Sequence, residues 1–298
     1  MEYTQLGTSD LQISKISLGG MSLPQDEVIS RRIVDRAIEL GINFFDTADL
    51  YQKGWNEAFL GEAFEGQRDK VIIATKVGNQ WRSDGSGWDW NPRKAYILEA
   101  VDQSLRRLRT DYIDLYQLHG GTIDDPLDEA IEAFEQLKQA GKVRYYGISS
   151  IRPNVIRTYI ERSNITSIMT QYSLLDRRPE ESTLSLLREN NIGVLVRGGL
   201  AKGLLVNKPA RAYVGHSEEG VAMAQRTVQG LATAKRGAAH VALQYCLLEK
   251  AVSSVVVGSS SEGQLEENVG AWGAEWISEG ERGKLAEQIP ALLYEKHR

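Results

Sequence analysis

Four titratable side chains follow three short, apolar, β-type stretches of the chain. These side chains are Asp46, Tyr51, Lys76 and His119. The carboxyl ends of the strands of a parallel α/β barrel all open on one face. We therefore expect the four side chains to converge on one pocket, although they are far apart in sequence.

A tyrosine near a lysine and a carboxylate is suited to donating a proton. A phenol has a reference pKa of about 10, so it is a poor acid at neutral pH unless a neighbouring charge stabilises its phenolate. Lys76 would supply that charge, Asp46 would keep the lysine ionised, and His119 would donate to a substrate oxygen. Each residue alone is as easily explained by packing or a rim ion pair, but together on neighbouring strands they favour protonation of a carbonyl oxygen. The set carries no hydride source, so reduction would need a cofactor.

Composition limits the classes of protein that fit. The chain has 298 residues, 42% of them hydrophobic and 25% charged, which suits one α/β barrel or two smaller domains. A net charge of -5 without a basic block argues against nucleic-acid binding. Cys246 is the only cysteine, which favours a buried thiol and a cytoplasmic protein. No apolar run reaches the roughly 20 residues of a membrane span, and the amino terminus lacks secretory character.

Strand and helix patterns alternate along the chain and predict a (β/α)₈ TIM barrel rather than a doubly wound sheet, with all of 1–298 in a single domain. A hairpin over Tyr3–Ile16 would form the floor, and a helix near the carboxyl terminus would be accessory. The eight predicted strands are Ile16–Leu18, Ile42–Phe45, Val71–Thr75, Ile113–Leu118, Val143–Ile148, Ser167–Gln171, Ile192–Val196 and Ser254–Val257.

Helix starts and long connections can also be predicted. A helix from about Asp26 should bury Ile29, Ile33, Ala37 and Leu40. Asn91-Pro92 and Asp125-Pro126 read as capped helix starts. Residues 79–90 and 201–220 are too long for simple turns, and Trp81, Trp88 and Trp90 in the first would either wall a substrate pocket or anchor the loop to the barrel rim. Few residues follow Pro290, so we expect an open pocket.

Several motifs together resemble the aldo-keto reductase family, and in particular the bacterial members of the branch that includes potassium-channel β subunits. The resemblance runs from Leu6 to Asn268, and its motifs are Asp46–Tyr51, Asn56-Glu57, Leu60-Gly61, Ala74–Lys76, Asp111–His119 and Gly147–Ser149. It implies a (β/α)₈ barrel that binds NADPH without a Rossmann domain, and no G-x-G-x-x-G follows a strand here. By the family pattern Tyr51 is the general acid, Lys76 and Asp46 tune it, and His119 orients the carbonyl.

The resemblance also implies a cofactor-binding set. Its members are Gly20, Met21, Asp46, Ser149, Ser150, Gln171, Arg197, Gly198, Gly199, Leu200, Lys202, Gly258, Ser260, Gln264, Glu267 and Asn268. Gly19 and Gly20 would let the backbone approach a ligand, and the loop with Lys202 would face a pyrophosphate.

This chain departs from the family pattern at five positions. Ser150 replaces an asparagine. Met169 replaces a glutamine, so Gln171 on the same strand face would bind the nicotinamide carboxamide, or else bond a neighbouring strand or loop. Arg197 replaces an aromatic residue and would stack on the nicotinamide or reach the pyrophosphate, unless it pairs with a rim carboxylate. Ser260 and Gln264 lack the cations of NADPH-preferring relatives, so NADPH is our first choice and NADH remains possible.

The leading hypothesis is NADPH-dependent reduction of a small aldehyde or ketone, with Tyr51 as general acid and no metal site. An alternative is a redox-sensing regulatory subunit that binds NADP(H) with little turnover. A third is a Schiff-base lyase using Lys76, which Asp46 disfavours by keeping the amine charged. Beyond a small carbonyl substrate, with no nucleic acid or membrane as partner, the substrate, direction and oligomeric state stay open.

Overall fold

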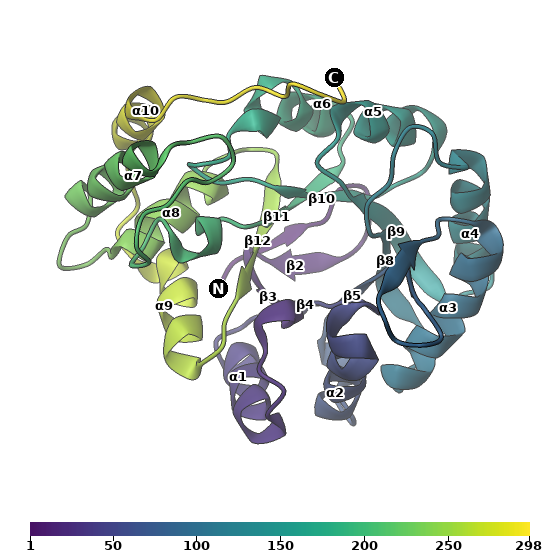
Figure 1. Ribbon diagram of the computed structural model, residues 1–298. Helices are drawn as coiled ribbons and strands as arrows, with labels where there is room; N and C mark the ends of the chain where they lie inside the picture. Colours follow the sequence, from purple (N-terminus) through teal and green to yellow (C-terminus); the bar gives the residue numbers. More distant parts are fainter.

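Eight parallel strands close into a barrel in the computed structural model, which describes residues 1–298 (Figure 1). Helices surround it, so the predicted (β/α)₈ fold is confirmed. Each predicted strand is present to within a few residues. In barrel order they are β3 (Ile16–Gly19), β4 (Phe44–Asp46), β5 (Ile72–Val77), β8 (Ile113–Leu118), β9 (Val143–Ser149), β10 (Ser167–Gln171), β11 (Gly193–Arg197) and β12 (Val252–Gly258), which pairs with β3.

Each barrel strand is followed by a helix, and two further helices are accessory. The helices are α1 (Glu27–Glu39), α2 (Trp55–Ala63), α3 (Lys94–Arg107), α4 (Leu127–Gln139), α5 (Pro153–Arg162), α6 (Thr183–Glu189), α7 (Glu218–Gly230), α8 (Ala238–Leu247), α9 (Glu262–Gly273) and α10 (Glu279–Gln288). The 3₁₀ turns are η1 (Gly20–Ser22), η2 (Tyr51–Gly54), η3 (Arg68–Lys70), η4 (Arg178–Glu181) and η5 (Ala201–Gly203). The accessory helices α7 and α10 pack together; α10 was expected, whereas α7 was not.

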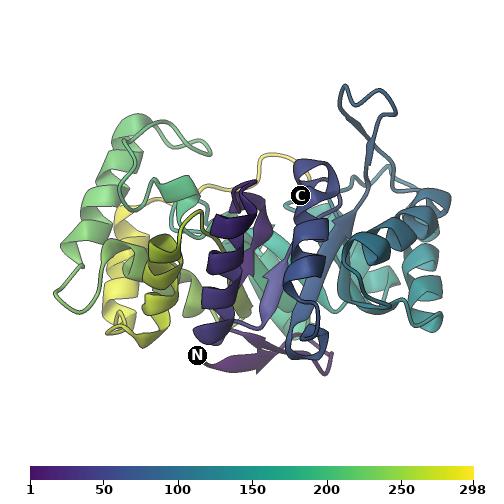
Figure 2. The ribbon, with the colours of Figure 1, turned by 90° about the horizontal axis from the view of Figure 1, so that it is seen from below.

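The amino-terminal hairpin closes the floor of the barrel, as predicted. Strands β1 (Tyr3–Gln5) and β2 (Gln12–Ser14) pair antiparallel, and they lie under the barrel (Figure 2). Leu6, Leu11 and Ile13 from this hairpin join Phe44 and Leu115 in one buried apolar cluster inside the strands. The barrel is therefore filled and shut at this end, so the opposite end carries the open pocket.

A larger core lies between the strands and the helices, and α1 shows how it forms. The carboxylate of Asp26 caps the helix by accepting from the Ile29 N–H at 3.0 Å. Ile33 and Ala37 are fully buried, as the helical spacing predicts. The prediction is wrong for Ile29 in the first turn of α1, which is 43% exposed.

The Asn-Pro and Asp-Pro pairs precede helices but do not cap them as predicted. Helices α3 and α4 begin at Lys94 and Leu127, and neither has a side-chain cap. The carboxylate of Asp125 instead accepts from the Trp90 indole N–H at 3.1 Å and from the Thr122 N–H at 2.6 Å. The tertiary contact with Trp90 thus takes the place of the predicted helix cap.

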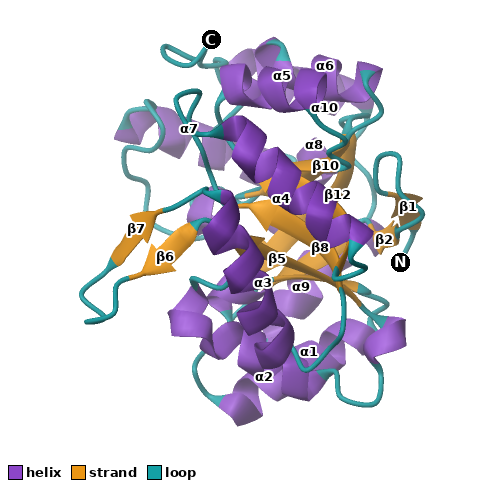
Figure 3. Cartoon of the chain, turned by 90° about the vertical axis from the view of Figure 1, so that its right-hand side faces the viewer, coloured by secondary structure: helices purple, strands orange, loops and turns teal.

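The connection 79–90 is an ordered hairpin rather than an irregular loop. Its strands are β6 (Asn79–Trp81) and β7 (Trp88–Trp90), and it projects from the barrel (Figure 3). The ring of Trp90 packs over Gly78, where an added Cβ would lie 2.6 Å from the indole. The anchoring alternative therefore describes Trp90. None of the helices is both long and apolar enough to cross a bilayer.

Candidate active site

The carboxyl ends of β4, β5 and β8 bring Asp46, Lys76 and His119 together. The Lys76 ammonium donates to Asp46 Oδ2 at 2.6 Å, to the Thr47 carbonyl at 2.7 Å and to the Tyr51 hydroxyl at 3.3 Å. Parallel pairing places Asp46 opposite Ala74 and Lys76 opposite Gln117. Residues between positions 46 and 119 of the chain therefore meet because three adjacent strands end at one level.

The turn after β4 presents the Tyr51 phenol to this cluster. Tyr51 begins η2, and the next two residues adopt left-handed backbone conformations, with φ of 47° at Gln52 and 55° at Lys53. Such conformations are strained for residues with a Cβ and persist where surrounding contacts hold them. The amide of Gln52 donates to the Leu23 carbonyl at 2.9 Å and its oxygen accepts from Asn56 at 3.1 Å. These bonds fix the turn and so the phenol.

Two buried polar residues of α2 brace the strand ends from behind. Asn56 donates to the Gly20 carbonyl at 2.8 Å and accepts from the Thr47 hydroxyl at 2.6 Å. Glu57 accepts from the Thr75 hydroxyl at 2.6 Å and from Arg107 at 2.7 Å. All these polar groups have hydrogen-bond partners, so α2 holds the carboxyl ends of β4 and β5 in a fixed position.

Lys76 and Asp46 form a buried, charged pair. Their side chains are 1% and 6% exposed. Burial alone would lower the pKa of Lys76, but the Asp46 carboxylate and the Tyr51 phenol reverse that effect and raise it above its usual value. The ammonium is therefore charged at physiological pH, and it lies 3.3 Å from the Tyr51 oxygen, where it can stabilise a negative charge that develops there.

His119 is a neutral imidazole at physiological pH. Burial, with the charges of Lys76 and Arg197, lowers its pKa to about 3. Its ring meets that of Tyr51 edge to face at 5.9 Å between centroids. Its Nδ1 atom is buried without a partner in the protein. A neutral ring beside the phenol can donate a hydrogen bond to a substrate oxygen without competing as an acid.

A cavity of about 910 Å³ opens over this cluster, which is in the range that holds a drug-sized or larger ligand. Tyr51, Asp46 and His119 line it, whereas Lys76 lies beneath. Of the predicted cofactor residues, those that line it are Met21, Asp46, Ser149, Ser150, Arg197, Gly198, Gly199, Leu200, Lys202, Gly258, Ser260, Gln264, Glu267 and Asn268.

Two predicted cofactor residues, Gly20 and Gln171, do not line the cavity. A Cβ on Gly20 would lie 2.3 Å from Asn56 Oδ1, so its glycine makes room for α2 rather than for a ligand. Gln171 uses its amide on the protein: Nε2 donates to Asp176 at 2.8 Å, and Oε1 accepts from Arg197 at 2.9 Å. The alternative of a bond to a neighbouring strand or loop is what the structure shows. Met169 lines the cavity instead.

The loop after β11 offers anion-binding groups. The backbone is left-handed at Ala201 and Lys202, with φ of 48° and 59°. The N–H groups of Gly199, Leu200 and Lys202 donate to no protein acceptor. Free amides in such a turn form a concave anion site, and they fit a dinucleotide pyrophosphate.

The other end of the cavity has no cation at the two positions noted from the sequence. Gln264 folds back, and its oxygen accepts from the Ser260 N–H at 3.0 Å and from the Ser260 hydroxyl at 2.9 Å. Both residues lie at the amino terminus of α9, which favours negative charge. Lys208 also lines the cavity, and its stem packs on Gly203.

Several lining residues were missed by the sequence reasoning. They include Lys208 and Asn207 on the 201–220 connection, Arg152 after β9, and Leu50 before Tyr51. The length of that connection was the one available signal, because long ordered loops tend to carry function. Conversely, none of Trp81, Trp88 and Trp90 lines the cavity, so the expected tryptophan wall is absent. No residue after Pro290 lines it either; that segment runs along α6 and α5 (Figure 1).

The barrel combines a buried Lys–Asp pair, a phenol and a neutral imidazole with a loop whose free backbone amides can bind an anion. These features define a class of oxidoreductase that relies on a bound dinucleotide for its hydride. Comparisons with known proteins agree. Residues 15–285 match the Aldo/keto reductase family. The chain is 50% identical to the uncharacterized oxidoreductase YqkF of Bacillus subtilis, with all of both chains covered.

A solved structure and a more distant relative extend the comparison. The aldo-keto reductase AKR11C1 from Bacillus halodurans, in its holo form, has a TM-score of 0.94 and 52% identity, over 100% of this chain and 99% of that chain. The NADH-specific methylglyoxal reductase of Escherichia coli is 33% identical over 72% of each chain. The chain belongs to the aldo/keto reductase family. It is a carbonyl-reducing, NAD(P)H-dependent oxidoreductase, and its cofactor is a nicotinamide dinucleotide.

Proposed function

We propose that the protein reduces a small aldehyde or ketone to the alcohol with NADPH as its preferred cofactor and Tyr51 as general acid. The observation that carries this proposal is the contact at 3.3 Å between the Lys76 ammonium and the Tyr51 hydroxyl on the wall of the cavity. A fixed positive charge at that distance stabilises the phenolate that forms when the hydroxyl gives up its proton.

The protein's part in the reaction is to hold the carbonyl and to supply a proton. Tyr51 and His119 donate hydrogen bonds to the substrate oxygen, which aligns the carbonyl and polarises it. As negative charge grows on that oxygen, the Tyr51 hydroxyl gives up its proton and Lys76 stabilises the phenolate that remains. The nicotinamide, when bound, supplies the hydride that no side chain can provide. In the balance, the carbonyl carbon gains a hydride and its oxygen gains a proton.

Lys76 is unsuited to Schiff-base chemistry. All three of its protons are used in hydrogen bonds to Asp46, Thr47 and Tyr51, and its side chain is 1% exposed. An amine attacks a carbonyl only when it is neutral and accessible. Lys76 therefore does not meet the requirements of a Schiff-base lyase.

The preference for NADPH rests on charge around the cavity. Lys202 and Lys208 line it, and neither forms an ion pair with a carboxylate of the protein. The 2′-phosphate of NADPH, which NADH lacks, adds negative charge that these ammonium groups attract. The name of the Escherichia coli relative specifies NADH, so we keep NADH as the alternative cofactor.

The test is Tyr51→Phe. Tyr112→Phe is the matched control, because Tyr112 directly precedes β8 and does not line the cavity. The wild-type protein and both variants are titrated with NADPH and NADH by quenching of tryptophan fluorescence, and then assayed with small aldehydes. We expect Tyr51→Phe to bind the cofactor normally and to lose turnover by at least about 10²-fold, while Tyr112→Phe keeps its activity. Unchanged turnover in Tyr51→Phe refutes its role as acid. Cofactor binding without turnover of any carbonyl by the wild type supports the regulatory-subunit alternative.

A further inference from the structure

Arg152 brings an unpaired cation to the rim of the cavity, directly after the segment that ends β9. Its side chain is half-buried and lines the cavity. Its guanidinium donates to one protein acceptor, the carbonyl oxygen of Gly121, through Nη1, and no carboxylate lies within ion-pair distance of it. A guanidinium has five N–H donors, so most of the donors of Arg152 have no partner in the protein.

Hydrogen bonds hold both the backbone and the side chain of this arginine. The Ser150 hydroxyl accepts from the Arg152 N–H at 3.1 Å. The bond from Nη1 to Gly121 ties the segment after β9 to the segment after β8. Strands β8 and β9 are direct neighbours in the barrel, so His119, which follows β8, and Arg152 lie on neighbouring stretches of the rim.

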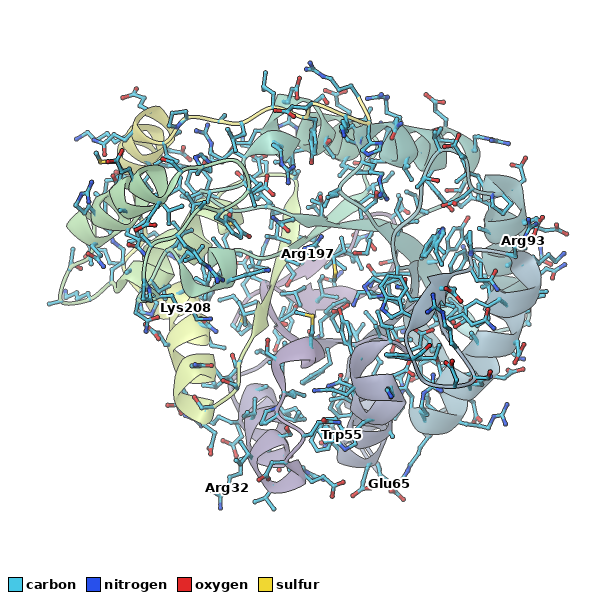
Figure 4. The ribbon with its side chains drawn as sticks, in the orientation of Figure 1. Arg32, Trp55, Glu65, Arg93, Arg197 and Lys208 are labelled. Carbon is cyan, nitrogen blue, oxygen red and sulfur yellow. The ribbon has the colours of Figure 1, made fainter.

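Arg152 lies across the barrel mouth from the groups that fit the phosphates of a dinucleotide. Those groups are on the loop after β11 and at the start of α9, and Figure 4 shows Lys208 on that side, beside α8 and α9. Strands β8 and β9 lie on the opposite side of the barrel in the same orientation (Figure 1). A cofactor whose phosphates occupy the side of β11 and α9 therefore leaves Arg152 to the substrate.

No acidic side chain neutralises Arg152 on the cavity side. The two carboxylates that line the cavity are Asp46, which is paired with Lys76, and Glu267, which is on α9. Asp125 follows β8 as well, but it does not line the cavity, and its oxygens accept from an indole and a backbone N–H. The β8 and β9 side of the cavity therefore presents a free guanidinium to a ligand.

A substrate bound for reduction can extend from the catalytic residues toward this cation. Under the proposed function its carbonyl oxygen lies at Tyr51 and His119. Gly120 follows His119, Ile151 precedes Arg152, and both line the cavity. They offer a backbone without a side chain and an apolar side chain, which suit a hydrocarbon spacer better than a polar one. A negative group at the far end of such a spacer meets Arg152.

We propose that Arg152 binds a carboxylate of the substrate, so that the substrates are carbonyl compounds that carry an acid group away from the reacting carbon. This inference rests on the proposed function and names its substrate class. A carboxylate matches two parallel N–H groups of a guanidinium in both charge and shape. A phosphate monoester carries more negative charge than a single guanidinium balances, so the carboxylate is the better match.

The experiment compares each ω-oxo acid with the neutral aldehyde of the same chain length, over a series of lengths, because the reach from His119 to Arg152 selects among them. Para-carboxybenzaldehyde and para-nitrobenzaldehyde form a rigid pair of nearly the same shape. The constants kcat and KM are measured at saturating cofactor for the wild type, Arg152→Gln and Arg152→Lys. Arg93→Gln is the matched control, because Arg93 carries the same charge at the outer edge of the molecule (Figure 4).

We expect the wild type to prefer the acid in at least one matched pair. In Arg152→Gln the ratio of kcat/KM for the acid to that for the neutral aldehyde should fall about tenfold. The change should be in KM rather than kcat, because the cation binds the substrate away from the reacting carbon. Arg152→Lys should keep part of the preference and Arg93→Gln all of it. Added salt should weaken the preference of the wild type, since it screens the ion pair.

Other results overturn the inference. A ratio that is the same in the wild type and Arg152→Gln removes the carboxylate contact. An equal loss of activity with both substrates means that Arg152 serves to tie the two rim segments together. An unchanged ratio with weaker NADPH binding, measured by fluorescence quenching, assigns Arg152 to the cofactor instead. A wild type that reduces neutral aldehydes but prefers no acid contradicts the inference alone, whereas a wild type that reduces no aldehyde contradicts the proposed function. Circular dichroism checks that each variant is folded.

Discussion

Replacing Lys76 by methionine should damage stability and activity for two separable reasons. Methionine keeps most of the volume of the side chain but removes its charge. The Asp46 carboxylate, 6% exposed, then loses its partner at 2.6 Å. Its remaining hydrogen bond, from Gln117, is long at 3.4 Å.

The cost can be estimated from this geometry. Removing one member of a buried ion pair typically destabilises a protein by about 3–5 kcal/mol, since the other charge stays buried and unpaired. At about 2 °C of melting temperature for each kcal/mol in a chain of this size, the midpoint should fall by roughly 6–10 °C. The Asp46→Asn/Lys76→Met double variant has no buried charge left, so most of this loss should be recovered.

Activity should not recover with stability. Neither variant has an ammonium at the Tyr51 hydroxyl, so turnover should stay about 10²-fold or more below that of the wild type in both. Thermal and urea unfolding of the wild type, both single variants and the double variant measure the stability cycle, and aldehyde reduction measures the rates. A double variant that is as unstable as Lys76→Met would refute the buried-charge argument. Near wild-type turnover in the double variant would refute the role of Lys76 at the phenol.

Two predictions concern pH. Burial, reinforced by Glu57, raises the pKa of Asp49 to about 8; the folded protein then holds this proton more tightly than the unfolded chain does, so stability falls as pH rises from about 4 to about 8. Asp49→Asn should remove that fall in stability, which amounts to about 4 kcal/mol between pH 5 and pH 8 at about 1.4 kcal/mol per pH unit. Urea unfolding across this pH range measures it. If the free energy of unfolding depends on pH equally in the wild type and the variant, the prediction is contradicted. Because the pKa of His119 is lowered to about 3, the pH profile of kcat/KM for aldehyde reduction should show no histidine ionisation between pH 5 and 8. A bell-shaped profile with an ionisation near pH 6.5 that disappears in His119→Asn would contradict a neutral ring.

Much of the fold could be predicted because its signals are local. The eight barrel strands are short apolar runs bounded by turns, and each was found to within a few residues. Asp46, Lys76 and His119 stand directly at or after such runs, so the barrel rule alone brought them together. The hairpin floor predicted over Tyr3–Ile16 is equally local, since its two short strands are close in sequence.

Other features depend on partners that are distant in sequence. Asp125 looked like a helix cap, yet it bonds the Trp90 indole. Gly20 looked like a ligand-facing glycine, yet its missing side chain makes room for Asn56. In both cases the local sequence is compatible with two roles for the residue. The role it takes depends on which polar group or side chain of another element packs against it.

The sequence by itself determined the alternation of strands and helices and the identity of the four residues at the strand ends, because hydrophobic periodicity and strand termination are properties of neighbouring residues. Only the tertiary structure decided the charge of the reacting end. The positive charge of Lys76 is balanced by Asp46. The Asp176 carboxylate is paired with Arg178 and also accepts a hydrogen bond from Gln171. Arg197 therefore keeps its charge in the cavity, since pairing between charges depends on distance in space rather than on position in the chain.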